Sequence, residues 1–155
     1  MHLADIPGFL VGRQAEEEAT IRHGVRAMAA IAQATVPWCA IIVRKTYGVA
    51  GAAHMNSGRF NLRYAWPSGD WGSLPIAGGL EAAYKSEIEA SDDPKAKLDE
   101  IEERLNRLRS PFRTAERFMI EEIIDPRNTR KILCDFAEMA APLRETGVSS
   151  FKIRP

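Results

Sequence analysis

Apolar residues recur at helical spacing along three stretches of the chain. From Gln14 to Ala34 they return every three or four positions, and glutamates crowd the first turn, where a helix dipole favours negative charge. Lys95 to Arg109 carries a narrow stripe of leucine and isoleucine, flanked by Glu–Arg pairs in the stabilising i,i+4 order. A third stripe follows Asp125, which is placed to cap a helix that starts with proline. The pattern predicts one amphipathic helix in each stretch.

Unbroken apolar runs predict the strands. Trp38–Val43 is partly β-branched and is typical of a strand buried on both faces of a parallel sheet. Phe60–Trp66 predicts a second strand, Ser68–Pro75 a loop, and Glu121–Ile124 a brief strand or turn. Helices therefore alternate with strands, and neither a repeat nor a linker divides the 155 residues. We predict a single α/β domain with crossover connections.

Shorter segments complete the predicted layout. Gly78-Gly79 introduces a helix that fades at Ser91, and Ser110-Pro111 starts a short helix that reaches Phe118. The opening segment LADIPGF resembles the exit of a strand whose beginning is missing. The tail, residues 144–155, carries few apolar side chains and is expected to be flexible.

Composition narrows the possible partners. The chain has 21 basic and 21 acidic residues, so it lacks the long-range field of a nucleic-acid binder or a polybasic membrane protein. No apolar stretch reaches the roughly 18 to 20 residues of a membrane span, and the first residues do not form a signal peptide. Cys39 and Cys134 lie in apolar segments and are predicted to be buried free thiols of a cytoplasmic, reducing compartment. We expect a small-molecule or protein partner, no nucleic acid and no membrane.

The candidate chemistry lies after the first predicted strand. Dinucleotide, P-loop, zincin and hydrolase-elbow motifs are absent, and three widely separated histidines suggest no local metal site. What remains is the small-residue turn Gly48–Gly51, preceded by Arg44-Lys45 and followed by His54. Backbone amides at the start of a helix can stabilise an oxyanion, and one such donor is worth roughly 3 to 4 kcal/mol in the transition state. A tight strand-to-helix turn without any catalytic role explains the same residues.

Several segments then indicate a family. IIVRKTYGVAGAAHM, YAWPSGDWGSLPIAGGLEAAY and SPFRTAERFMIEEIIDPRNTR, with others between Leu3 and Leu143, resemble the C-terminal half of the carboxyltransferase (β) subunit of biotin-dependent acyl-CoA carboxylases. Propionyl-CoA, methylcrotonyl-CoA and acetyl-CoA carboxylases are of this type. The resemblance implies a crotonase-like (ClpP/crotonase) βαβ superhelix domain over residues 1–143, N-terminally truncated, with a charged helical insertion at about 92–110 and a flexible tail at 144–155.

The resemblance also implies a site shared between two chains. In the family the N-terminal domain of one subunit holds the acyl-CoA, and the C-terminal domain of its partner supplies a backbone oxyanion hole for biotin. Carboxybiotin arrives on a biotin carboxyl carrier protein or domain, so no cofactor is bound covalently here, and no metal is implied. The matching biotin-binding positions are Tyr47, Gly48, Val49 and Ala50, with the N–H groups of Val49 and Ala50 as the catalytic donors. Val49 departs from the commoner glycine, and a positive φ there would cost about 1 to 2 kcal/mol.

Three functional interpretations stay open. In the first, the chain is the biotin side of an acyl-CoA carboxyltransferase, inactive alone and completed by a complementary acyl-CoA-binding half. In the second, it is a non-catalytic remnant or oligomerisation module of the same fold. In the third, it is a free-standing crotonase-type acyl-CoA binder. Arg44 and Lys45 line a ligand entrance or form a solvated basic pair, and Trp66 and Trp71 are expected to pack in the core or at an interface. We expect a homo-oligomer. The acyl group is not specified by these residues.

Overall fold

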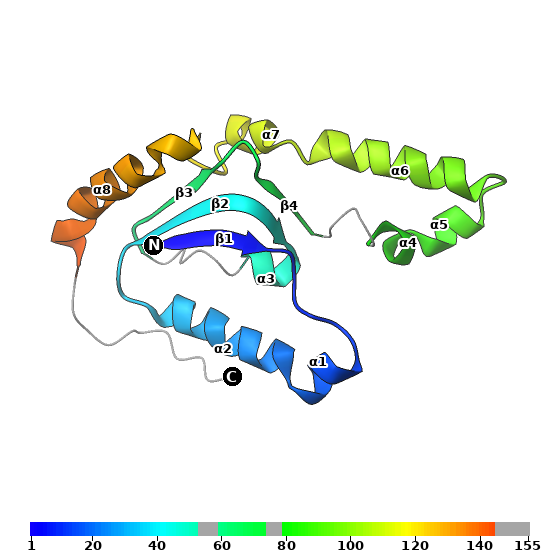
Figure 1. Ribbon diagram of the computed structural model, residues 1–155, viewed down its shortest axis with the longest axis horizontal. Coiled ribbons are helices and arrows are strands. Elements are labelled where there is room, and N and C mark those ends of the chain that lie inside the picture. The colour runs from blue at the N-terminus through cyan, green and yellow to red at the C-terminus, as the bar shows by residue number, and fades with distance from the viewer. Residues whose placement is uncertain (53–58, 74–78, 145–155) are drawn as a thin grey trace.

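The computed structural model describes residues 1–52, 59–73 and 79–144. Its centre is a parallel sheet in the order β1-β2-β3-β5, with β4 paired to the far end of β2 (Figure 1). The strands are β1 (His2–Ile6), β2 (Trp38–Tyr47), β3 (Asn61–Ala65), β4 (Asp70–Gly72) and β5 (Glu122–Ile123). The strand β2 is thus the central element, because it pairs with three others.

Helices cover both sides of this sheet. They are α1 (Arg13–Glu17), α2 (Thr20–Gln33), α3 (Gly48–Ala52), α4 (Leu80–Ala83), α5 (Lys85–Glu89), α6 (Pro94–Leu108), α7 (Pro111–Glu116) and α8 (Thr129–Ala140), with 3-10 turns at Pro126–Asn128 and Ala141–Leu143. In Figure 1, α2 lies on one side of the sheet and α8 on the other, while α4 to α6 extend sideways as a helical hairpin. The layout confirms the predicted α/β class.

Apolar packing under α8 and α7 builds the core. One cluster joins Cys39 and Ile41 of β2 to Phe136 of α8, and a second joins Ile42 to Ala65 and Ile120. Full burial of a side chain such as Ile41 contributes about 1.5 to 3 kcal/mol. The predicted buried run of β2 therefore contributes residues to both clusters.

The helix predicted from Gln14 to Ala34 is interrupted, so the prediction of one continuous helix is wrong. Ala19 has a φ of 56°, in the left-handed region, and separates α1 from α2. Gly24 of α2 packs against Phe9, since a Cβ at this position would lie 2.3 Å from the Phe9 ring. Ile21, expected on the core face, is exposed.

Three further expectations need correction. The predicted loop after Ser68 contains β4, and the helix expected from Gly79 to Ser91 is divided at Tyr84 into α4 and α5. Cys39 is buried, which raises the pKa of its thiol to about 11. Cys134 is exposed, because it precedes the buried Phe136 by two residues and so lies on the opposite side of α8.

The helices expected at Lys95–Arg109 and after Asp125 are confirmed, whereas the one expected to reach Phe118 ends at Glu116, because Phe118 has a φ of 56°. Lys95–Arg109 becomes α6 with Ile101 fully buried, and Asp125 caps the 3-10 turn that leads into α8 by accepting from the Arg127 N–H. His54 and the tail beyond Arg144 lie outside the described residues. Within the described ranges, no helix is long and apolar enough to cross a membrane.

Candidate functional site

The strand β2 changes its pairing halfway along its length. Ala4 pairs with Ile42 but Ile6 pairs with Thr46, so the single residue Asp5 faces three residues of β2. On the other edge, β3 pairs with β2 as far as Ile42, and β4 pairs with it from Lys45 onward. Val43–Lys45 is therefore unpaired on the β1 edge, and Val43 and Arg44 lie between the β3 and β4 ladders on the other edge. This stretch leads directly into the predicted site.

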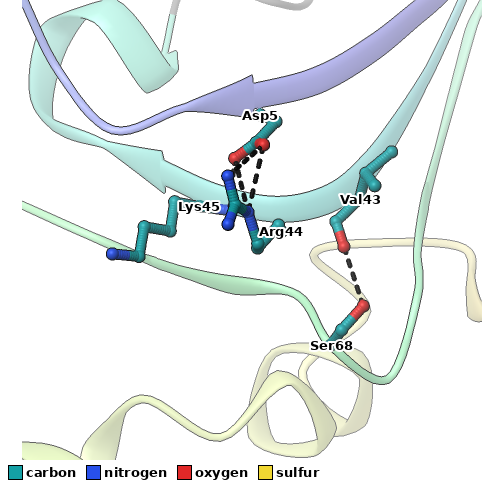
Figure 2. Close-up of polar contacts among 5 residues, drawn as sticks. All are labelled: Asp5, Val43, Arg44, Lys45 and Ser68. Carbon is teal, nitrogen blue, oxygen red and sulfur yellow. Dashed lines mark hydrogen bonds and ion pairs between the residues drawn. The ribbon is translucent and has the colours of Figure 1, made fainter.

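Side chains bind the main-chain groups that this irregular stretch releases (Figure 2). The Asp5 carboxylate accepts the Lys45 N–H at 3.1 Å, and the Ser68 hydroxyl donates to the Val43 carbonyl at 2.8 Å. Asp5 also pairs with Arg44, whose Nη2 donates to Oδ2 at 2.8 Å. The hydrogen bond from the Arg44 guanidinium holds the pKa of Asp5 below its ordinary value.

These contacts give the basic pair two different roles. Arg44 pairs with Asp5 of β1 and so helps to hold the frame of the strand. The Lys45 side chain points away from that pair in Figure 2. Lys45 is exposed and lies two residues before Tyr47. It is therefore the member of the basic pair that is a candidate for contact with an anionic ligand.

The turn after β2 places the predicted oxyanion donors in the first turn of α3. Gly48 has a φ of 60°, a left-handed conformation that costs glycine nothing. Val49 is not among the described residues with positive φ, so the strain that a positive φ would impose there does not arise. The Val49 side chain is 63% exposed and Ala50 is buried. The glycine at position 48, and not a glycine at 49, lets the chain turn here.

The amides of Val49 and Ala50 have no acceptor of their own within the helix, because the first residues of a helix lack one. Among the described residues, no backbone carbonyl outside α3 accepts from either amide. The two predicted donors are therefore adjacent and lack a backbone acceptor among the described residues; adjacent backbone donors can stabilise a developing negative charge on a ligand oxygen.

Tyr47 is held inside the protein rather than at the surface. Its side chain is 2% exposed, and its hydroxyl donates to Asp70 of β4. Arg109, next to the end of α6, donates to the Tyr47 hydroxyl and lies 4.9 Å from the centre of its ring. The predicted contact of Tyr47 with biotin would therefore have to use the main chain. Burial raises the pKa of Asp70 and lowers that of Arg109, while the nearby Lys45 charge opposes the shift at Asp70.

Asp70 and Arg109 were not predicted as parts of the site. They lie 23 and 62 residues beyond Tyr47, so no local spacing joins the three residues. The only signal was that Asp70 falls inside one of the segments that carry the family resemblance.

An apolar pocket of about 280 Å³ adjoins the turn on the side of α2. Its lining includes Ala50, Ile6, Phe9, Met28 and Ile31. Within the described part of the chain, no cluster of histidine, cysteine and carboxylate side chains could hold a metal ion. The site therefore combines two backbone donors with an apolar wall.

Comparison with known proteins places the chain among carboxyltransferases. The model of the carboxyl transferase domain matches residues 1–151. The methylmalonyl-CoA carboxyltransferase 12S subunit of Propionibacterium freudenreichii subsp. shermanii is 36% identical over 94% of this chain and 28% of its own length. A putative propionyl-CoA carboxylase beta chain of Bacillus subtilis is 39% identical over 81% of this chain and 25% of its own length.

Solved structures agree on the fold. A transcarboxylase 12S crystal structure, a hexamer assembly with methylmalonyl-coenzyme A and methylmalonic acid bound, superposes with a TM-score of 0.80 and 35% identity, over 98% of this chain and 30% of that one. The expected crotonase-like fold is thus confirmed. The chain spans between a quarter and three tenths of the length of these relatives.

Proposed function

Because the chain belongs to the carboxyl transferase domain family, we propose that it forms the biotin side of an acyl-CoA carboxyltransferase. The observation that carries the proposal is the adjacent pair of amides at Val49 and Ala50, which follow a left-handed Gly48 and have no backbone acceptor within the described part of the chain. Backbone donors of this kind stabilise charge without a side-chain base. The proposal rests on the position of these amides and on the resemblance of the surrounding segments.

The two amides would hold the ureido oxygen of biotin and stabilise the charge that develops on it. Carboxybiotin, carried by a partner protein, would supply both the carboxyl group and the base for the reaction. The apolar wall around Ala50, Phe9 and Met28 would exclude water from the same oxygen. Tyr47 and Gly48 would act through the main chain, by fixing the direction in which the Val49 and Ala50 N–H groups point.

The acyl-CoA side would come from elsewhere, because the chain spans less than a third of its relatives. We propose that a complementary half, in a cytoplasmic homo-oligomer, provides it. The purified 155-residue chain is then expected to form no malonyl-CoA or methylmalonyl-CoA. Measurable product from this chain alone would contradict that part of the proposal.

Exposed apolar side chains support the proposed association. Leu10 and Val11 are 77% and 91% exposed beside α1, and Phe118 is 94% exposed after α7. Apolar patches that are left open on one chain favour contact with another. We expect sedimentation velocity to show concentration-dependent association, and a Phe118→Ser variant to weaken it. A monomer at all concentrations would argue against an oligomer built by this chain alone.

Titration of the ¹⁵N-labelled chain with biocytin tests the site directly. We expect the amide resonances of Val49 and Ala50 to move, and a Val49→Pro variant to bind several-fold more weakly, because proline removes one donor but is tolerated in the first turn of a helix. Val49→Ala, which keeps the N–H, is the matched control.

The same titration separates the alternatives. Unmoved amides at Val49 and Ala50 would contradict a biotin site. Movement with propionyl-CoA but not with biocytin would instead favour a free-standing acyl-CoA binder that uses the same donors. Movement with neither compound would favour a non-catalytic remnant.

A further inference from the structure

An ion pair joins the places where the helical hairpin α4–α6 leaves and rejoins the sheet. Asp70 lies in β4, just before the chain departs, and Arg109 lies just after α6, where the chain returns. The Arg109 Nη2 is 2.5 Å from the Asp70 Oδ1, so the pair joins the two ends of the excursion. In Figure 1 the hairpin extends away from the strands, which makes its base its main connection to the rest of the protein.

The hairpin is held together by its own contacts. Lys97 of α6 pairs with Glu87 of α5 at 3.2 Å, the Arg104 guanidinium lies 5.8 Å from the Tyr84 ring centre, and Ile101 is fully buried. These contacts keep α5 and α6 together without help from the sheet. Arg109 is therefore not needed to build the hairpin itself.

Arg109 differs from the other basic residue near the end of α6. The Arg107 side chain is 72% exposed and pairs with Glu103 within the helix. The Arg109 side chain is only 14% exposed, and its buried Nε has no hydrogen-bond partner among the described residues. Because a buried guanidinium is costly unless it is well paired, its position depends on the Asp70 carboxylate and the Tyr47 ring.

The contacts of Arg109 converge on the residue that enters the turn. Its guanidinium covers the Tyr47 ring at 4.9 Å and donates to the Tyr47 hydroxyl, which in turn donates to Asp70. Tyr47 is followed directly by Gly48, whose φ of 60° sets the direction of the next amides. A fixed Tyr47 ring thus limits the rotation of the main chain just before Val49 and Ala50.

We propose that Arg109 is a positioning residue, which fixes the direction of the Val49 and Ala50 amides through Tyr47 and Asp70. Its effect on a ligand rests on the proposed function, but its effect on the turn does not. The charged helix α6 would thereby take part in the site through the residue at its end, although the helix itself lies away from the turn.

Hydrogen exchange and amide shifts of the full chain test this role in Arg109→Gln. We expect the resonances of Tyr47, Val49 and Ala50 to move and amide exchange at the end of β2 that pairs with β4 to rise about tenfold, while Ile41 in the first half of β2 stays unchanged. Arg109→Lys, which keeps the charge near Asp70, should restore part of the wild-type pattern. Arg107→Gln on the same helix is the control and should leave the turn unmoved.

Two outcomes would overturn the proposal. One is an Arg109→Gln protein whose turn amides keep their wild-type shifts and whose β4-paired end of β2 keeps its wild-type exchange rates. The other is an equal loss of protection along the whole of β2, which would indicate a general effect on stability. If Arg109→Gln does not fold, Tyr47→Phe removes only the hydroxyl, and unmoved amides in that variant would contradict the proposal as well.

Biocytin affinity is a separate measurement. If the proposed function holds, Arg109→Gln should weaken binding several-fold while Arg107→Gln leaves it unchanged. If wild-type protein fails to bind biocytin, the proposed function fails, yet the exchange data still decide whether Arg109 positions the turn.

Discussion

The two halves of β2 are held in place by different kinds of interaction. Trp38–Ile42 pairs in regular register with β1 and β3, and its inward side chains are buried in the core. Val43–Tyr47 is irregular against β1, exchanges β3 for β4, and is held by Asp5, Ser68 and Arg109. Apolar clusters thus stabilise the half that builds the frame, whereas polar contacts, including those of the buried Tyr47, shape the half that leads to the candidate site.

This difference means that stability and site geometry can be perturbed separately. Loss of buried volume acts on the whole cooperative fold, since the packing of the core is shared by several elements. Loss of one polar contact near the turn acts on a short segment and leaves the core intact. Substitutions in each half, taken from the largest expected effect to the smallest, test the distinction.

Ile41→Ala should have the largest effect. Ile41 is fully buried under α8, and truncation to alanine leaves a cavity that costs about 2 to 5 kcal/mol. Urea denaturation followed by circular dichroism measures the loss. Val49→Ala, at an exposed position, is the control and should change the free energy of unfolding by less than about 0.5 kcal/mol. A loss below about 1 kcal/mol for Ile41→Ala would show that the core does not depend on this half.

Gly51→Ala should affect both stability and the site. The added Cβ would lie 2.6 Å from the Thr46 carbonyl carbon, so α3 must move away from β2. We expect a loss of about 1 to 3 kcal/mol together with displaced Val49 and Ala50 resonances. Gly72→Ala is the matched control, because its Cβ would meet nothing within 4 Å. Unmoved turn amides in Gly51→Ala would contradict the close packing of α3 on β2.

Gly48→Ala isolates the conformation of the turn from its packing. The new Cβ would lie 3.4 Å from the Ser73 carbonyl oxygen, an ordinary contact, so the cost comes from the φ of 60° and amounts to about 1 kcal/mol. Gly48→Asn should cost less, since asparagine tolerates the left-handed region. Thermal unfolding and amide shifts measure both variants. Equal stability of wild type and Gly48→Ala would mean that the turn adopts another conformation.

The smallest effect is expected from titration of Asp5. Arg44 lowers the pKa of Asp5 in the folded protein. The ionised Asp5 therefore makes its full contribution to the free energy of unfolding at pH values above the ordinary carboxylate range. That contribution is lost as the pH falls through the lower pKa of the folded state. The Lys45 amide shift, followed from pH 6 downward, should therefore change with a midpoint below that of an unperturbed aspartate.

Asp5→Asn is the control for this titration. It keeps an acceptor for the Lys45 N–H but removes the titrating group, so the Lys45 resonance should no longer follow the pH. A wild-type midpoint at or above the ordinary aspartate value would contradict the pairing with Arg44. Asp5→Ala should speed exchange of the Lys45 amide several-fold, because it removes the acceptor altogether.

The sequence by itself determined the elements whose signals are local. The apolar run after Pro37, the stripe of α6 and the small residues at Gly48–Gly51 located a buried strand, a charged helix and the turn between β2 and α3, because periodicity and chain flexibility act over a few residues. The likeness of several segments to one family also indicated the fold and the place of the candidate donors.

Only the tertiary structure decided the shape of the site. The irregular register opposite Asp5, the strand β4 and the assembly of Tyr47 with Asp70 and Arg109 join residues 23 to 62 positions apart. No local pattern encodes such contacts, because they depend on which elements the packed sheet brings together. The structure also decided which residue of the turn is left-handed. It is Gly48, at the entry to α3, where a side chain would destabilise the left-handed conformation.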